Sequence, residues 1–325
     1  MTRLSRILVT GGAGYLGSIL VTLLLETGHR VRVVDNLRFG GQSLLSVWSH
    51  PSFDFVRLDI RDRPAVSASL REIDAVVHLA AIVGDPACAR LPEEAHEINL
   101  QASLDLLEES RRAGVSSFVF ASTCSNYGKM PDPDGFVEEN SRLAPVSLYA
   151  KTKVQFESAL LETAGANSMC ITPLRLATLY GVSPRMRFDL TLNEFTMKML
   201  TEKRLVVYGE RFWRPYVHVR DAARAICAVL EAPERAHGQV YNVGSTAQNF
   251  RKCDLVEMIR AHAPDARIEH IERQEDPRDY RVCFAKISRD LGYSTTRTVQ
   301  AGISEVARFV QSGAIQSFDD PAFRN

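Results

Sequence analysis

Three observations in the first half of the sequence predict an α/β fold with a doubly wound parallel sheet. Short apolar runs recur at 6–10, 30–34, 53–58, 75–80 and 116–122, and each has the length of a buried strand. Helical patterns separate them at 15–28, at 64–72 and from about 92 to 113. Gly28 and Gly114 stand where the first and the long helix should end. Strands that alternate with helices in this way form parallel sheets covered on both faces.

The second half is less regular and predicts a smaller α/β lobe. A helix from about 147 and a strand at 170–176 continue the first pattern. The later elements are shorter: strands at 205–209, 216–219 and 239–244, and a helix near 220–231. We therefore divide the chain into a first domain at 1–175 and a lobe at 176–325, with about 215–245 returning to the first domain.

Composition excludes several classes of function. Lys and Arg together number 39, as do Asp and Glu, so the formal net charge of zero argues against nucleic-acid or membrane binding by bulk charge. Apolar stretches such as ILVTLLL are too short to span a bilayer, and the start MTRLSRILVTGG has no leader pattern, so we expect a cytoplasmic protein. The six cysteines form no CxxC pair and the eight histidines no HxxxH pair. We expect reduced cysteines and no metal site.

The run GGAGYLG at 11–17 follows a predicted strand and opens a predicted helix, which is the context of a dinucleotide-binding loop. In such a loop Gly11 permits the tight turn, Gly14 lets the backbone approach a diphosphate, and Gly17 allows close packing of helix and strand. The helix N-terminus then faces the phosphates with free N–H groups.

Acidic residues at the ends of the next two strands support this interpretation. Asp35 follows about twenty residues after the glycine loop, where a carboxylate can accept a hydrogen bond from a ribose 2′-hydroxyl. This carboxylate would repel a 2′-phosphate and favours NAD over NADP, although the nearby Arg38 weakens that preference. Asp59 and Ile60 are placed for the adenine, or are plain turn residues.

Tyr149 and Lys153 lie four residues apart at the start of a predicted helix, so both point from one face. A tyrosine with a pKa near its reference value of ~10 is a poor base. A neighbouring ammonium and a positive nicotinamide ring favour the phenolate and suit it to acid–base catalysis. Tyr149 would take a proton from a sugar hydroxyl while hydride leaves the same carbon. Thr123 would orient the reacting oxygen.

Several motifs in the same order resemble those of the extended short-chain dehydrogenase/reductase family of nucleotide-sugar epimerases, dehydratases and reductases. They are GGAGYLG, Asp35, Asp59-Ile60, HLAA at 78–81, Asn99, STCSNYG at 122–128, YAKTK at 149–153 and the late arginine-bearing segments. The resemblance implies a Rossmann-type domain with a smaller C-terminal substrate lobe. It also implies NAD as the cofactor, a nucleotide-diphosphate sugar as substrate, and a homodimer formed through the helices at 93–113 and 147–163.

Carried over by position, the resemblance assigns roles to further residues. The cofactor would contact Gly11, Gly14, Tyr15, Leu16, Asp35, Asn36, Asp59, Ile60, Leu79, Ala80, Ala81, Tyr149 and Lys153, with Asn99 supporting its pocket. The substrate would contact Val83, Ser125, Asn126, Thr178, Arg187, Asn193, Arg214 and Arg278. Arg214 and Arg278 would bind the diphosphate, since guanidinium groups engage phosphate oxygens bidentately. Arg185, Arg187 and Asn193 could also reach a carboxylate or sugar hydroxyls, or lie in a solvent-exposed loop.

The residues after Thr123 separate the possible activities. Where 4,6-dehydratases of the resembled family carry an Asp and a Glu, this chain has Cys124 and Ser125. Cys124 is either a small pocket or core residue or an acid that contacts the substrate. We therefore expect an epimerase that oxidises a sugar hydroxyl transiently and returns the hydride. The alternatives are a keto-sugar reductase or dehydrogenase, a dehydratase with unusual acid–base residues, and a non-catalytic NAD-sensing protein.

Overall fold

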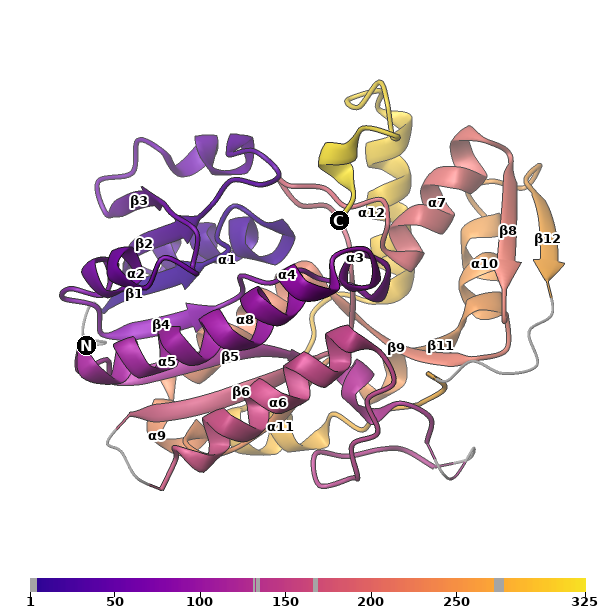
Figure 1. The fold of residues 1–325 in the computed structure, drawn as a ribbon. Coiled ribbons are helices and arrows are strands. Elements are labelled where there is room, and N and C mark those ends of the chain that lie inside the picture. The colour runs from indigo at the N-terminus through magenta and orange to yellow at the C-terminus, as the bar shows by residue number, and fades with distance from the viewer. Residues whose placement is uncertain (1–4, 131, 133–134, 166–168, 272–277) are drawn as a thin grey trace.

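The computed structural model describes residues 5–130, 132, 135–165, 169–271 and 278–325, and its centre is a seven-stranded parallel sheet (Figure 1). The strand order is β10-β6-β5-β4-β1-β2-β3. The strands are β1 (Arg6–Thr10), β2 (Arg30–Asp35), β3 (Phe53–Arg57), β4 (Ala75–His78), β5 (Ser117–Thr123), β6 (Cys170–Leu176) and β10 (Tyr241–Val243). The order reverses between β1 and β4, and a parallel sheet opens a ligand-binding crevice at such a point. The predicted Rossmann-type fold is confirmed.

Helices cover both faces of this sheet and create two separate cores. On one face α1 (Tyr15–Glu26) packs against α8 (Val219–Glu231); on the other, α5 (Ala102–Arg112) packs against α2 (Arg63–Ser69) and α6 (Leu148–Glu162). Neighbouring residues of β1 point to opposite cores: Ile7 and Val9 join the first, and Leu8 joins the second. Strands buried on both faces read as continuous apolar runs, which is why the sequence revealed them.

The smaller lobe lies at the right of Figure 1 and contains two small sheets. β7 (Thr178–Tyr180), β9 (Trp213–His218) and β11 (Asn249–Arg251) form one; β8 (Arg204–Tyr208) and β12 (Arg267–Ile271) form the other. Its helices are α7 (Thr191–Thr201), α10 (Lys252–Arg260) and α12 (Val299–Gln311), while α9 (Pro233–Ala236) and α11 (Ala285–Leu291) lie against β6 and β10. The exact division into domains stays a prediction.

One expected element is interrupted. Over 92–113 the chain forms α4 (Pro92–His96), the π-helical turn η2 (Glu97–Gln101) and then α5, and the short helix α3 (Asp85–Arg90) precedes them. The wide turn presents Asn99, whose side chain accepts from the Ile82 N–H at 2.8 Å and donates to the Ile82 carbonyl at 2.9 Å. The predicted helix is therefore present over 92–112, but it contains a π-helical turn and a long-range contact of Asn99 that helical periodicity does not report.

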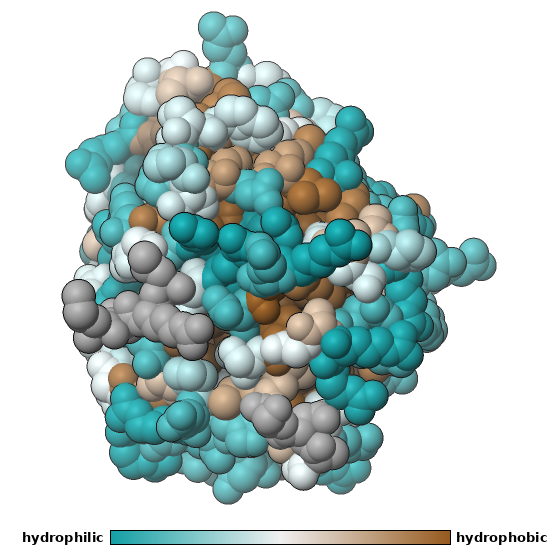
Figure 2. Space-filling model, turned by 90° about the vertical axis from the view of Figure 1, so that its left-hand side faces the viewer, coloured by the Kyte–Doolittle hydropathy of each residue, from teal (hydrophilic) through white to brown (hydrophobic). Residues whose placement is uncertain are grey.

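The surface is mixed. On the face at the left of Figure 1, hydrophilic side chains surround scattered apolar patches (Figure 2). Within the described residues, no helix is long and apolar enough to cross a membrane. Of the charged stretch at 273–282, residues 273–277 lie outside the described part of the chain, as do residues 1–4 of the N-terminal segment.

Candidate active site

A cavity of about 610 Å³ opens at the crevice between β1 and β4 and extends to the smaller lobe. The structure brings most of the predicted site residues into its wall. They are Gly11, Gly14, Tyr15, Leu16, Asp35, Asn36, Asp59, Ile60, Leu79, Ala80, Ala81, Val83, Thr123, Ser125, Tyr149, Lys153, Thr178, Arg187, Arg214 and Arg278. Asn99, Cys124, Asn126 and Asn193 are not among the residues that line it.

The glycine loop is shaped for close approach of a ligand. Gly11 has φ +73°, and a Cβ there would lie 2.8 Å from the Ala80 nitrogen at the end of β4. A Cβ on Gly17 would lie 2.2 Å from the Gly11 carbonyl oxygen. Gly14 caps α1 without a side-chain hydrogen bond, so the first N–H groups of the helix remain available to an anion. These features fit the diphosphate of a dinucleotide.

Asp35 is held rigidly at the end of β2. Its carboxylate accepts hydrogen bonds from the Ala13 N–H at 3.0 Å and the Leu37 N–H at 2.8 Å. Burial raises the pKa of Asp35, and these two hydrogen bonds oppose the rise. The Arg38 guanidinium lies 3.0 Å from the Glu94 carboxylate. This engagement of Arg38 is consistent with a site for NAD.

Asp59 lines the cavity just after β3. Hydrogen bonds from the Arg61 guanidinium lower the pKa of Asp59 to about 2, although burial acts in the opposite direction. Asn36 lies near the same carboxylate, with its Nδ2 atom 3.4 Å from Oδ2. The Asp59 carboxyl group is therefore ionised at neutral pH, and its main partner is the Arg61 guanidinium.

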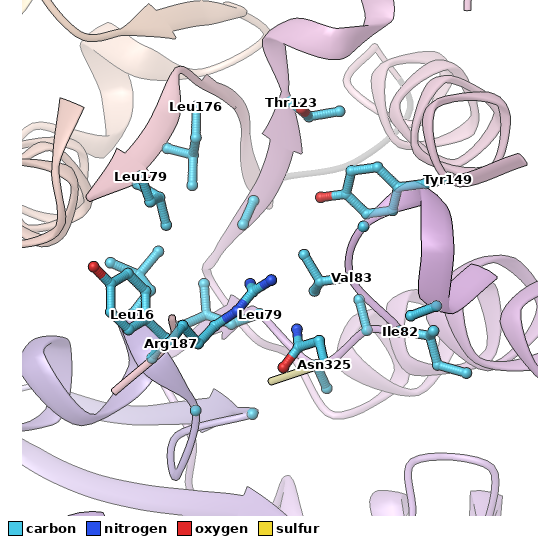
Figure 3. Close-up of a pocket in the computed structure, with 18 of the residues that line it drawn as sticks. Leu16, Leu79, Ile82, Val83, Thr123, Tyr149, Leu176, Leu179, Arg187 and Asn325 are labelled. Carbon is cyan, nitrogen blue, oxygen red and sulfur yellow. The ribbon is translucent and has the colours of Figure 1, made fainter. Parts of the chain in front are cut away.

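Tyr149 and Lys153 face the cavity from the first turns of α6. Ser147 caps this helix by accepting a hydrogen bond from the Ala150 N–H at 3.2 Å. The Lys153 ammonium donates to the Ala121 carbonyl at 2.8 Å and lies 5.8 Å from the centre of the Tyr149 ring. Figure 3 shows the Tyr149 hydroxyl pointing into the cavity, with Thr123 at the end of β5 nearby. Acid–base groups from two elements thus converge on one space.

Burial dominates the electrostatics of this pair. Desolvation raises the pKa of Tyr149 well above its usual range, and it lowers the pKa of Lys153 to about 7. In the protein without ligands, therefore, the ammonium does not bring the phenol into the working range. The sequence-based expectation invoked a second positive charge, that of the nicotinamide ring, beside the Lys153 ammonium. Further positive charge near the hydroxyl is required.

Cys124 and Asn126 point away from the cavity into the protein interior. The Cys124 thiol donates to the Arg175 carbonyl at 3.2 Å, and burial raises the pKa of the thiol far above its usual range. Asn126 donates to the Ser122 hydroxyl at 3.1 Å, beside a buried ion pair of Arg175 and Glu157. The 3₁₀ turn η3 (Cys124–Tyr127) sets these directions, leaving Thr123 and Ser125 at the cavity. The structure thus supports the pocket or core interpretation of Cys124 and no substrate contact by Asn126.

Asn193 is likewise buried. It accepts from the Gly181 N–H at 3.0 Å and donates to the Arg187 carbonyl at 2.9 Å. It therefore shapes the loop at 181–189 and does not reach a ligand in the cavity. The structure contradicts the expected direct contact, because the loop folds back over this side chain. Asn99 acts in a similar indirect way by holding Ile82, in line with the supporting role expected of it.

Arg187, Arg214, Lys252 and Arg278 are among the cationic residues that line the cavity. Arg278 forms an ion pair with Asp85 of α3. The guanidinium of Arg214 lies 5.5 Å from the centre of the Tyr280 ring. Arg187 forms an ion pair with Asp189 at 2.6 Å, and Figure 3 shows its guanidinium directed into the cavity. This concentration of positive charge fits an anionic substrate.

Sequence reasoning missed several residues that shape the site. Asp85, Tyr280 and Phe39 line the cavity, and the Arg185 guanidinium lies 4.1 Å from the centre of the Phe39 ring. His78 is buried between the hydroxyls of Thr10 at 2.7 Å and Ser103 at 2.8 Å, and burial lowers its pKa to about 3. Of these residues, Arg185 was already considered from the sequence, and His78 had a signal in its place in HLAA at the end of a strand. In the described part of the chain, no group of three His, Cys, Asp or Glu side chains could hold a metal ion.

A glycine loop at the crevice of a parallel sheet, facing Tyr149, Lys153 and Thr123, defines a NAD-dependent enzyme of the extended short-chain dehydrogenase/reductase type. Residues 7–244 match the NAD dependent epimerase/dehydratase family, and the chain belongs to that family.

Its relatives include both kinds of enzyme in the family name. The chain is 28% identical to a UDP-glucose 4-epimerase of Corynebacterium glutamicum, over 90% of this chain and 92% of that one. It is 30% identical to a dTDP-glucose 4,6-dehydratase of Actinoplanes sp., over 94% and 98%. Among solved structures, a UDP-glucose 4-epimerase from Thermotoga maritima with UDP-glucose superimposes with a TM-score of 0.86 at 28% identity, covering 95% of this chain and 100% of that one.

Proposed function

We propose that this protein is a NAD-dependent nucleotide-sugar epimerase that oxidises a sugar hydroxyl transiently to a ketone. When bound, NAD would supply a hydride acceptor for the sugar carbon and a positive nicotinamide ring that favours the Tyr149 phenolate. The observation that carries the proposal is the convergence of Tyr149, Lys153 and Thr123 on the dinucleotide cavity, combined with the inward direction of Cys124.

The residues of this chain have separable tasks in such a reaction. Tyr149 takes the proton from the sugar hydroxyl and gives it back to the ketone oxygen. Lys153 contributes positive charge to the phenolate and, as a donor, holds the nicotinamide ribose. The hydroxyl of Thr123 donates to the reacting oxygen and fixes its position. The buried walls exclude water, which strengthens each of these interactions.

The surroundings of Thr123 argue against dehydration by a carboxyl pair. Cys124 is a neutral thiol with its hydrogen committed to a main-chain carbonyl, and Ser125 has an alcohol side chain with no basic character near neutral pH. Neither side chain replaces an acid and a base that eliminate water. An epimerase needs neither, because the hydride returns to the same carbon from which it left.

The arginines that line the cavity support a nucleotide-diphosphate sugar as the substrate. In this proposal Arg214 and Arg278, which both line the cavity, bind the diphosphate of a nucleotide sugar. Thr178, Val83 and Ser125 also line the cavity, and in this proposal they contact the sugar. The related epimerase structure from Thermotoga maritima contains UDP-glucose, which supports this class of ligand.

A homodimer belongs to the same proposal. α5 and α6 pack side by side at the front of Figure 1, as a helical interface requires. Light scattering coupled to gel filtration should give about twice the chain mass of 36.2 kDa.

The proposed activity is tested with a panel of UDP-, dTDP-, GDP- and CDP-sugars, including uronic acids. Products are followed by mass spectrometry and by absorbance at about 340 nm, where reduced nicotinamide absorbs. An isomer of unchanged mass without accumulation of reduced nucleotide supports epimerisation. Loss of water would replace the proposal with a dehydratase. A change of two hydrogens with stoichiometric cofactor turnover would replace it with a reductase or dehydrogenase, and NAD binding without any product would indicate a sensor.

A further inference from the structure

Residues 318–325 run across the catalytic cavity, and Arg324 and Asn325 line it. This segment, called the strap below, contains the 3₁₀ turn η5 (Pro321–Phe323) and follows α12. In Figure 1 its end lies between α3 and α12. Figure 3 shows Asn325 beside Arg187, near Leu79 and Ile82 from the loop after β4.

The first anchor of the strap is the loop at 181–189. The Phe188 N–H donates to the Phe323 carbonyl at 2.9 Å. The Phe188 ring also packs edge-on against two strap rings, with centres 5.0 Å from Phe318 and 5.9 Å from Phe323. Arg185 donates to the Arg324 carbonyl at 2.9 Å. Aromatic packing and main-chain hydrogen bonds therefore hold the strap in one position.

The second anchor spans the cavity. The Asn325 N–H donates to the Asp189 carboxylate at 3.3 Å, on the side of the same loop. The Asn325 carbonyl accepts from the Arg90 guanidinium at 3.0 Å, and Arg90 belongs to α3. The strap thus connects the helix that follows β4 with the loop that follows β7.

Three polar atoms near the strap lack partners. Arg185 Nε, Arg324 Nε and Asn325 Oδ1 are buried without a hydrogen-bond partner in the described part of the chain. Arg185 as a whole is only 6% exposed, whereas the Arg324 side chain is 41% exposed and its Nη2 atom donates to the Asp319 carboxylate at 2.8 Å. Buried polar groups are almost always paired, and leaving one unpaired costs free energy. Arg185, Arg324 and Asn325 all line the cavity, so a ligand bound there can satisfy these three atoms.

Their position favours the dinucleotide over the sugar substrate. Arg185 packs on Phe39, which lines the cavity immediately after the Asp35 region, and its charge acts on the Asp35 carboxylate. The diphosphate-binding Arg214 and Arg278 belong instead to the part of the cavity beside Tyr280. Two guanidinium Nε donors suit the diphosphate oxygens of a dinucleotide, and a carboxamide oxygen suits a ribose hydroxyl.

We propose that the strap completes the dinucleotide-binding site: Arg324 and Asn325, with Arg185, bind NAD, and NAD leaves only when the strap undocks. Slow release of NAD suits an enzyme whose NAD is reduced and reoxidised within each turnover. This advantage rests on the proposed function, whereas the binding of NAD by the strap does not. The proposal concerns residues far from Tyr149 in sequence and separate from the proton-transfer groups.

The test measures dissociation of NAD from the protein without any substrate. NAD-loaded wild type and the R324A/N325A double variant are diluted into excess competing ADP-ribose, and retained NAD is quantified over time after rapid desalting. The dissociation rate of the double variant should rise at least about tenfold, equivalent to roughly 1.4 kcal/mol. Arg308→Ala is the matched control, because Arg308 lies on the exposed side of α12 and outside the cavity. Its rate should equal that of wild type.

Phe323→Ala provides an independent variant that loosens the anchor without removing either ligand-binding side chain. It should also accelerate NAD release. If the double variant does not fold, as judged by thermal unfolding, Asn325→Ala is measured in the same way. Wild-type dissociation rates in the folded variants would overturn the proposal. So would an unchanged rate combined with a raised KM for the nucleotide sugar, which would assign the strap to the substrate. If the wild type has no epimerase activity, the proposed function fails, but the NAD dissociation rates still test the role of the strap.

Discussion

Arg278 and Asp85 form an ion pair that joins the smaller lobe to α3 across the edge of the cavity. The two side chains are 38% and 26% exposed, so solvent screens the pair and its coupling is about 0.2–1 kcal/mol. In the proposed function, Arg278 exchanges this carboxylate for a phosphate of the substrate.

Arg278→Ala should weaken substrate binding more than it slows the chemical step. A hydrogen bond between charged groups contributes about 1.5–3 kcal/mol, so KM for the nucleotide sugar should rise by at least roughly tenfold while kcat changes less. Arg211→Ala is the control, since Arg211 is 83% exposed and outside the cavity. Equal KM values for the two variants would remove Arg278 from the substrate site.

Tyr149→Phe should nearly abolish turnover while NAD binding is retained. Loss of a positioned acid–base group costs roughly 10²–10⁴ in rate. Steady-state kinetics and NAD titration measure the two effects separately. Tyr180→Phe is the matched control, because its hydroxyl is buried without a partner in the described residues and lies outside the cavity. Full turnover by Tyr149→Phe would disprove the proposed mechanism.

The free energy of unfolding of the cofactor-free protein should depend on pH through the titration of Lys153. Its folded pKa of about 7 is below the usual value of 10.5, so between these pH values the unfolded chain binds the extra proton. Stability contributed by this site therefore rises with pH, by roughly 1.4 kcal/mol per pH unit, and the penalty of the buried charge is fully present below about pH 7. Urea unfolding of wild type and Lys153→Met at pH 7, 8 and 9 measures this difference. Parallel pH profiles would show that Lys153 titrates normally.

Cys124→Ala should leave turnover close to that of wild type and lower stability modestly. The thiol is buried and protonated, so its loss removes packing and one weak hydrogen bond, about 1 kcal/mol in total. Iodoacetamide should accordingly fail to label Cys124 in the folded protein, as peptide mass spectrometry can check. A large loss of kcat with stability preserved would instead identify Cys124 as an acid in the reaction.

Asn193→Ala should destabilise the protein because it removes the side-chain hydrogen-bond partner of the Gly181 N–H and of the Arg187 carbonyl. Unsatisfied buried groups cost about 1–3 kcal/mol each, measurable as a lower midpoint of urea unfolding. Asn140→Ala at an exposed position is the control. If stability is unchanged and only KM rises, Asn193 contacts substrate directly.

The sequence by itself determined the features that depend on local geometry. Apolar runs marked the buried parallel strands, the spacing of Gly11, Gly14 and Gly17 marked a ligand-binding turn, and the four-residue spacing placed Tyr149 and Lys153 on one helix face. The family and its cofactor followed from the order of these motifs. The strand, glycine-loop and helix-face patterns each involve residues that are close together in the sequence. They can therefore be recognised without knowledge of the fold.

Only the tertiary structure decided how distant segments meet. It turned Cys124 and Asn126 inward while leaving Thr123 and Ser125 at the cavity, and it inserted a π-helical turn where Asn99 binds Ile82. It also brought Asp85 to Arg278, and the strap to Arg90 and Arg185. Periodicity carries no information about such contacts, because they depend on the packing of elements that are remote in the chain. For the same reason no sequence motif predicted that Arg324 and Asn325 line the cavity.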